Sequence, residues 1–204
     1  MSAQFDILHS LRVKGLARPE ALSGLSGVPV DELESACAPL VDAGWVLVRS
    51  GAMAGYMLTP AGKAEADRQL AADPQTTQAR EALAAFDEAF LPHNTKFKQI
   101  CHRWQMVDDQ QPNDHSDAEY DARVIGDLAS FHADFVPLLD SIAEKLPRMG
   151  RYRARLDVVL ERIQAGDTAS FARPMYESYH DIWMELHNDV VLSLQRERSA
   201  ADES

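Results

Sequence analysis

Residues 43–63 read AGWVLVRSGAMAGYMLTPAGK, and this stretch decides how the N-terminal part of the chain folds. Trp45 to Arg49 is an apolar, partly β-branched run that predicts a strand, and Tyr56 to Leu58 predicts the returning strand. The glycines and small residues between them are typical of a hairpin tip. Thr59 then caps a helix over residues 60–72, because threonine is a good N-cap and proline is favoured at the first helical position.

Three helices are predicted before this hairpin. The first ends near Gly15, and the second opens at Pro19. A tight turn at residues 25–28 leads into the third helix, Val30 to Ala43, which Gly44 ends. Apolar side chains recur at helical spacing along the third helix and predict its buried face: Leu33, Cys37, Leu40 and Val41.

This arrangement over residues 16–63, about a quarter of the chain, resembles the winged helix-turn-helix of MarR- and PadR-type regulators. The resemblance is carried by the turn at Gly27, the Leu33/Cys37/Leu40 spacing, Ala43-Gly44-Trp45-Val46, and Leu58-Thr59-Pro60-Ala61-Gly62-Lys63. It implies a transcriptional regulator that places its third helix in the major groove of operator DNA. The DNA-contacting residues would then lie at the start of that helix, in the wing and in the flanking segments: Lys14, Arg18, Val30, Ser35 and Arg49.

The charge of the third helix conflicts with DNA binding. It holds Asp31, Glu32, Glu34 and Asp42 and has no lysine or arginine, whereas DNA affinity comes mainly from basic side chains that neutralise phosphates. The whole chain has a net charge of -12, shared unevenly between -2 for residues 1–72 and -10 for residues 73–204. The N-terminal part is therefore close enough to neutral for one face to contact DNA.

The alternative is an accessory subunit without DNA binding, because winged helices also serve as protein–protein modules. Residues 94–105, NTKFKQICHRWQ, are similar to actinobacterial helical domains found with PEP-utilising phosphotransferases. That resemblance implies a partner enzyme onto which the winged helix docks. The acidic third helix favours this alternative directly.

The remainder of the chain is predicted to be helical, so the expected fold is mostly α, with a small β-wing. Helices are expected over residues 80–90 and 92–106, 120–146, 152–165 and 171–198, with a polar loop at residues 108–117. The interruption at Asp73-Pro74 predicts two domains. These are a winged-helix domain over residues 1–72 and a helical bundle over residues 73–204 that senses a small molecule and forms a homodimer.

The candidate ligand site is a concentration of histidine and aromatic residues in the C-terminal half. His180, Trp183 and His187 share one helix face, which Tyr176 extends by one turn, and amphipathic side chains of this kind suit the wall of a pocket. The alternative is that they are half-buried core residues. The complete candidate set also draws on two other helices: Asn94, Lys98, His102, His132, Tyr176, His180, Trp183 and His187.

No metal site is predicted. His180 and His187 are seven residues apart, which is roughly 10.5 Å along a helix, so they cannot easily share one ion. The C-terminal half also resembles the metal-binding FCD sensor domains of GntR-type regulators, through Asp127 and Phe131-His132, Ala165-Gly166-Asp167 and His180. Leu156 falls near the position of that family's middle histidine, so the metal ligand set is incomplete.

The sequence lacks the motifs of common enzyme classes. It has no P-loop, no Gly-rich dinucleotide loop, no G-x-S-x-G and no H-E-x-x-H, so neither an enzymatic activity nor a cofactor is expected. Cys37 and Cys101 are expected to be buried, unpaired thiols. No signal peptide and no apolar run of roughly 20 residues is found, which predicts a cytoplasmic protein.

Overall fold

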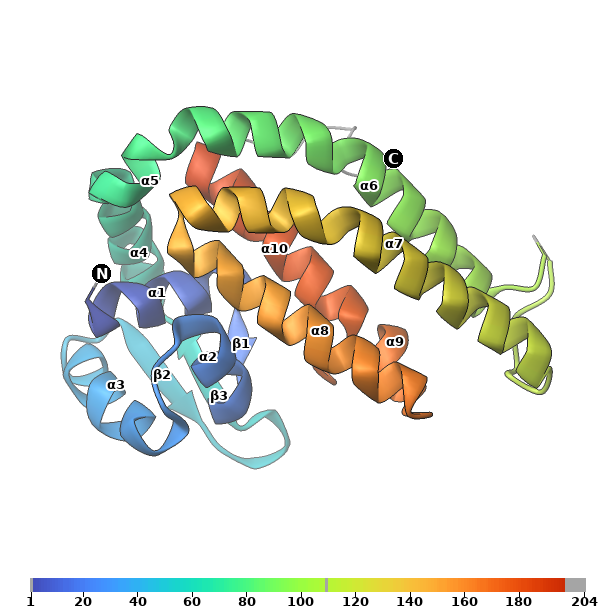
Figure 1. Ribbon diagram of the computed structural model, residues 1–204. Helices are drawn as coiled ribbons and strands as arrows, with labels where there is room; N and C mark the ends of the chain where they lie inside the picture. Colours follow the sequence, from blue (N-terminus) through green and yellow to red (C-terminus); the bar gives the residue numbers. More distant parts are fainter. Residues whose placement is uncertain (1, 109, 197–204) are drawn as a thin grey trace. The chain divides into compact units, whose positions relative to one another are not determined.

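The computed structural model describes residues 2–108 and 110–196, and the protein is mostly helical with one small antiparallel sheet (Figure 1). It divides into two compact units. The first comprises residues 2–80 together with 187–196, and the second comprises residues 81–186. Compared with the expected division after residue 72, the first unit also takes in a short helix that follows this position and the end of the last helix.

The first unit contains the following elements: α1 (Ala3–Lys14), β1 (Leu16–Ala17), α2 (Pro19–Ser26), the 3-10 helix η1 (Val30–Glu32), α3 (Leu33–Asp42), β2 (Val46–Arg49), the 3-10 turn η2 (Gly51–Met53), β3 (Gly55–Leu58), α4 (Pro60–Ala72) and α5 (Pro74–Gln78). The sheet order is β1-β3-β2, and both pairings are antiparallel. Strand β2 pairs with β3 from Val46 opposite Leu58 to Arg49 opposite Gly55. The predicted hairpin and the helix at residues 60–72 are present, while β1 was not expected.

The core of the first unit forms where the apolar faces of α1 and α3 meet the sheet. Its members include three of the four residues of α3 whose spacing predicted a buried face, together with side chains of α1, β2 and β3: Ile7, Leu8, Leu11, Leu33, Cys37, Leu40, Val46 and Leu58. The fourth, Val41, is 37% exposed, so its predicted burial was wrong. A buried polar contact joins the two ends of the chain within this unit. His9 Nε2 donates to Asp189 Oδ1 at 2.8 Å, and Asp189 also accepts from the Ser193 hydroxyl at 2.9 Å.

A close junction links the end of α3 to the start of α4. The Thr59 hydroxyl donates to the Gly44 carbonyl oxygen at 2.7 Å and accepts from the Gly62 amide at 2.9 Å. The Thr59 amide in turn donates to the Trp45 carbonyl oxygen at 2.9 Å. Thr59 is therefore both the N-cap of α4 and the residue that fixes α4 against the beginning of the hairpin.

The second unit is built from long helices: α6 (Arg80–Gln105), α7 (Ala118–Lys145), the 3-10 turn η3 (Pro147–Met149), α8 (Gly150–Gln164), the short helix α9 (Ala169–Ala172) and the first part of α10 (Tyr179–Leu194). Pro92 lies inside α6 without ending it, so the two helices expected over residues 80–106 are one. The polar loop predicted at residues 108–117 is present before α7, and its described part covers residues 106–108 and 110–117.

The single helix predicted from Phe171 to Arg198 was wrong within the described residues, and Arg198 lies outside them. Helix α9 ends at Ala172, and α10 begins only at Tyr179. The cause is Pro174, which disfavours helical backbone at the residue before it, and Arg173 is accordingly extended with φ -65 and ψ 124. Met175 and Glu177 then take positive φ angles of 59° and 52°, which a helix does not permit.

Aromatic rings form the core of the second unit. Trp183 is fully buried and stacks on Phe90, with 4.7 Å between ring centroids, and it also packs against Phe97 and Phe135. Its indole Nε1 donates to Asn94 Oδ1 at 2.9 Å, so the one polar atom of the ring has a partner. Over residues 2–108 and 110–196, no helix is long and apolar enough to cross a membrane.

Candidate functional site

The exposed face of η1 and α3 is acidic. The side chains of Asp31, Glu32, Glu34 and Asp42 are exposed, while Leu33, Cys37 and Leu40 are buried beneath them. Two of the predicted DNA-contacting residues, Val30 and Ser35, lie on this same acidic surface. Val30 is 47% exposed, and the Ser35 hydroxyl donates to the Glu32 carbonyl oxygen at 2.9 Å.

The predicted cationic residues lie outside this surface. Arg18 precedes α2, Arg49 ends β2, and both are exposed, whereas Lys14 in the last turn of α1 is half-buried. Arg49 pairs with Gly55 on one side of strand β3. On the other side of β3, the backbone of Ala17 and Arg18 lies so close to Gly55 that a Cβ there would contact it. The sheet therefore brings Arg18 and Arg49 to the same end of strand β3, one on each side of it.

Strand β2 is an edge strand with apolar side chains that are open to solvent. Leu47 is 50% exposed and Val48 is 61% exposed. Because successive residues of a strand point to opposite faces, both faces of β2 are open to solvent here. Val41 at the end of α3 and Met53 in the hairpin tip are also exposed. Within the described part of the chain, no other strand pairs with the outer edge of β2, so its backbone groups there are available.

The predicted ligand-binding face of the last helix is largely core. Trp183 and Asn94 are buried against each other, as described above, and neither lines the 410 Å³ cavity described below. His187 is 1% exposed and belongs to the first unit, while His180 is partly exposed in the second. Tyr176 lies in the irregular segment between α9 and α10, so it does not extend this helix face.

The remaining predicted ligand residues are also separated from one another. His102 is exposed on α6, and Lys98 is half-buried and has a partner. His132 of α7 is bound within the fold. Its Nε2 donates to Asp157 Oδ1 at 2.8 Å, and its Nδ1 accepts from the Tyr179 hydroxyl at 3.1 Å. Among the eight predicted residues, the structure joins Asn94 to Trp183 by a hydrogen bond, and none of the eight lines the 410 Å³ cavity described below.

The environment of His132 favours its neutral form. Burial lowers the pKa of this imidazole below its ordinary value, and the Arg153 charge acts in the same direction, while the hydrogen bond to Asp157 opposes both. Arg153 holds the same carboxylate through Nε at 2.8 Å and contacts Asp140 with Nη1 at 2.9 Å. Because both ring nitrogens and the carboxylate are occupied, this cluster is structural.

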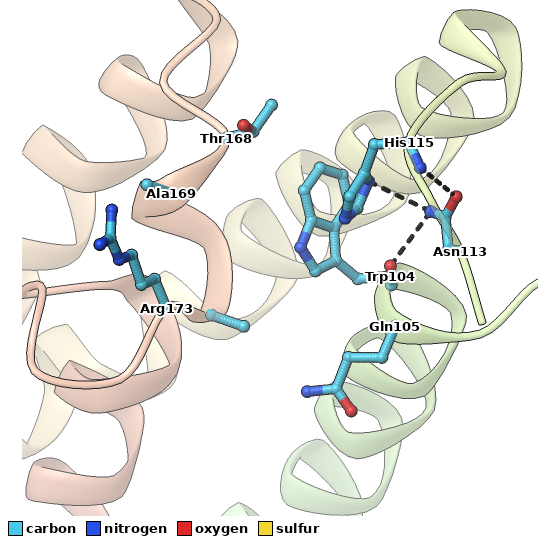
Figure 2. A pocket seen from close by; sticks show the side chains of 8 residues that line it. Trp104, Gln105, Asn113, His115, Thr168, Ala169 and Arg173 are labelled. Carbon is cyan, nitrogen blue, oxygen red and sulfur yellow. Dashed lines mark hydrogen bonds between the residues drawn. The ribbon is translucent and has the colours of Figure 1, made fainter.

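An open surface pocket of about 410 Å³, called the cavity below, lies elsewhere in the second unit (Figure 2). Figure 2 shows Trp104, Gln105 and His115 on one side of it and Thr168, Ala169 and Arg173 on the other. These residues come from the end of α6, the following loop and the segment around α9. The complete lining is Trp104, Gln105, Asn113, His115, Thr168, Ala169, Ala172 and Arg173.

One wall of the cavity is held by a buried carboxylate. Asp121 accepts from His115 Nδ1 at 3.0 Å and from Asn113 Nδ2 at 2.8 Å. Asn113 Nδ2 also reaches the Trp104 carbonyl oxygen at 3.1 Å, and Asn113 Oδ1 accepts from the His115 amide at 3.0 Å. The His115 ring packs on Trp104 with 4.4 Å between centroids, and the other face of Trp104 stacks on Phe171 at 4.2 Å.

The facing wall supplies a cation. Arg173 is exposed, and its guanidinium lies 5.4 Å from the centroid of the Tyr176 ring. Arg162 lies over the same ring at 5.4 Å, but it also binds Asp167 through Nη2 at 2.8 Å. Tyr176, predicted to line a pocket together with His180 and Trp183, instead packs against a lining arginine and is not itself part of the lining.

Sequence reasoning missed this cavity because its lining comes from segments about 60 residues apart, near residues 104–115 and 168–173. The available signal was the density of polar residues in the loop before α7, which contains Asn113 and His115. No group of His, Cys, Asp and Glu side chains among the described residues has the geometry of a metal site.

Comparison of the chain with protein-family models, with curated proteins and with solved structures gave no match. The inferences below therefore rest on the residues and geometry described above.

Proposed function

We propose that this chain is a regulatory winged-helix protein whose N-terminal unit docks a protein partner, so that it acts as an accessory subunit. The order of elements supports the winged-helix part of the proposal. Helices α1, α2 and α3 precede the β2–β3 hairpin, β1 adds a third strand, and α4 follows. The observation that carries the docking part is the acidic, partly apolar surface that α3 and β2 expose.

Charge favours a protein partner over DNA at this surface. A winged helix that reads DNA places the N-terminal end of α3 in the major groove, which would bring Asp31, Glu32 and Glu34 near phosphates. Two like charges about 4 Å apart repel by about 1 kcal/mol in water and by about 4 kcal/mol near a protein surface. Three such carboxylates would oppose an association that normally depends on phosphate neutralisation.

The edge of β2 indicates how the partner would bind. An exposed edge strand accepts an extended segment through backbone hydrogen bonds, and alternate side chains supply specificity. Leu47 and Val48 offer apolar contacts to such a segment. Glu34 and Asp42, exposed on the preceding helix α3, add negative charge. A second copy of this chain would bring acidic residues together. We therefore expect a different protein that presents an apolar strand flanked by lysine or arginine.

Selection from a library of displayed peptides against the purified protein tests this proposal. The expected result is enrichment of extended apolar peptides with basic flanks, whose affinity falls at least tenfold in Val48→Lys and in Glu34→Lys. Val158→Lys is the matched control, because Val158 is 54% exposed on α8 in the other unit. Peptides that carry no basic residues, or that bind Val48→Lys and Val158→Lys equally, would contradict the docking surface.

A DNA-binding transcriptional regulator is the second candidate, and one observation favours it. Arg18 and Arg49 are both exposed and flank strand β3, which puts their backbones two strand spacings apart, roughly 10 Å. Two cations at the base of a wing suit contacts to a phosphate backbone. If operator DNA is the partner, Arg49→Ala and Arg18→Ala should each weaken binding and flatten its salt dependence, whereas Arg80→Ala should do neither.

Whether the partner is a protein or DNA, the second unit would bind the small-molecule effector that regulates the first unit. The cavity residues Thr168 and Arg173 belong to the segment that leads into α10. Helix α10 begins in the second unit and ends in the first, where Asp189 binds His9. A small-molecule effector in the cavity would thus act on a segment continuous with the helix that the two units share. Assembly as a homodimer and a cytoplasmic location, both expected from the sequence, also belong to this proposal.

A further inference from the structure

We infer that the cavity between the end of α6, the loop residues Asn113 and His115, and α9 binds a small oxyanion ligand, with Arg173 holding a carboxylate or phosphate group. The inference specifies the ligand class for the small-molecule part of the proposed function. It does not depend on whether the first unit binds protein or DNA, because every residue involved belongs to the second unit.

Arg173 has no carboxylate partner within residues 2–108 and 110–196. Four other arginines of the same unit bind carboxylates at short distance: Arg103 to Asp127 at 2.6 Å, Arg153 to Asp157 at 2.8 Å, Arg155 to Glu177 at 2.6 Å and Arg162 to Asp167 at 2.8 Å. Among the described residues, Arg173 packs against the Tyr176 ring and has no carboxylate partner, as is also true of Arg123 beside Tyr120, but of these two only Arg173 lines the cavity. In a part of the chain with a net charge of -10, an arginine whose donors are not used by a carboxylate is available to an anionic ligand.

The opposite wall presents a pre-oriented histidine. The Asp121 carboxylate can only accept, so His115 Nδ1 carries the proton in their 3.0 Å hydrogen bond. Nε2 of the neutral ring is then an acceptor, which suits a hydroxyl of the ligand, such as that of a monoprotonated phosphate. The ring is fixed by its packing on Trp104.

The other polar groups of the lining are also available. Gln105 and Thr168 line the cavity, and no side-chain partner is present for either among the described residues. They add an amide and a hydroxyl to the Arg173 guanidinium and the His115 ring. The one carboxylate behind this wall, Asp121, is occupied by His115 and Asn113. Arg173, Gln105 and Thr168 supply the donors of this lining, and a lining with these donors and no carboxylate of its own selects an anion over a cation.

Titration of the purified protein with inorganic phosphate and with succinate tests the site, followed by the nuclear magnetic resonance signal of the Trp104 indole N–H. Succinamide is the neutral probe. We expect a saturable shift with phosphate, succinate or both, and none with succinamide. The two anions distinguish a phosphate ligand from a carboxylate ligand.

Arg173→Gln should weaken the affinity for the preferred anion at least tenfold. Lys96→Gln is the control, because it removes one exposed positive charge from α6 in the same unit and Lys96 does not line the cavity. Both changed side chains are exposed, so both variants should fold. Equal affinity in the two variants, an equal shift with succinamide, or no shift with either anion would overturn the inference. The titration contains neither protein partner nor DNA, so its failure is distinguishable from failure of the docking proposal.

Discussion

Replacement of Gly62 by alanine should destabilise the first unit, although Gly62 lies in a helix and alanine is the better helix former. A Cβ built on Gly62 would lie 2.0 Å from the Trp45 carbonyl oxygen, 2.8 Å from the carbonyl carbon and 3.0 Å from the Trp45 Cα. All three atoms are backbone, so no side chain can rotate away. Helix α4 or the start of the hairpin must move.

The size of the effect follows from three contributions. Inserting a methyl group into a packed contact costs about 1–3 kcal/mol. The movement also stretches the hydrogen bond from the Thr59 amide to the same Trp45 oxygen, now 2.9 Å, which is worth about 1 kcal/mol. Alanine recovers about 1 kcal/mol through its helix propensity. We expect a net loss of about 2 kcal/mol in the free energy of unfolding.

Gly126→Ala is the matched control. Gly126 is an exposed residue of α7, and a Cβ there would meet no atom within 4 Å. Only the propensity contribution remains, so this variant should gain about 0.5–1 kcal/mol. Urea denaturation followed by circular dichroism and tryptophan fluorescence gives both values. If Gly62→Ala is as stable as Gly126→Ala, the close approach of α4 to Trp45 is wrong.

Two further predictions concern buried groups. Burial lowers the pKa of His132 below its ordinary value of 6.5, so the unfolded chain takes up a proton that the folded protein excludes. Stability should therefore fall as the pH drops from about 6.5 towards the lowered pKa of the folded state, and His132→Gln should reduce this slope in urea titrations; an unchanged slope would refute the assignment. Burial raises the pKa of Cys37 to about 11 and that of Cys101 to about 12. Neither thiol should react with iodoacetamide at mildly alkaline pH until urea unfolds the chain. An adduct detected by mass spectrometry on the native protein would contradict this prediction.

The first unit was largely predictable because its signals are local. Thr59 and Pro60 mark the start of α4 by capping chemistry, and α4 ends at Ala72 as expected. The spacing of Leu33, Cys37 and Leu40 gave the buried face of α3, since side chains three or four residues apart lie on one side of a helix. Strand β1 was missed because its two residues are in a strand only through their pairing with β3.

The ligand site was not predictable in the same way. Trp183 lies on a regular stripe of its helix, but such a stripe marks the face that packs against the core more often than the wall of a pocket. Its burial against Phe90 and Asn94 depends on tertiary packing, which the spacing of residues in the sequence does not reveal. The cavity instead depends on the meeting of Trp104 and Arg173, and no local pattern relates residues so far apart in the sequence.

The most direct test of the central claim is photo-crosslinking in cells with a photoreactive amino acid in place of Val48, an exposed residue of the edge strand β2. The same amino acid in place of Val158, exposed in the other unit, is the control. If the first unit docks a protein, position 48 should give a discrete adduct that protease removes and nuclease leaves intact, and position 158 should not give it. An adduct at position 48 that nuclease removes would contradict protein docking and would establish DNA as the partner.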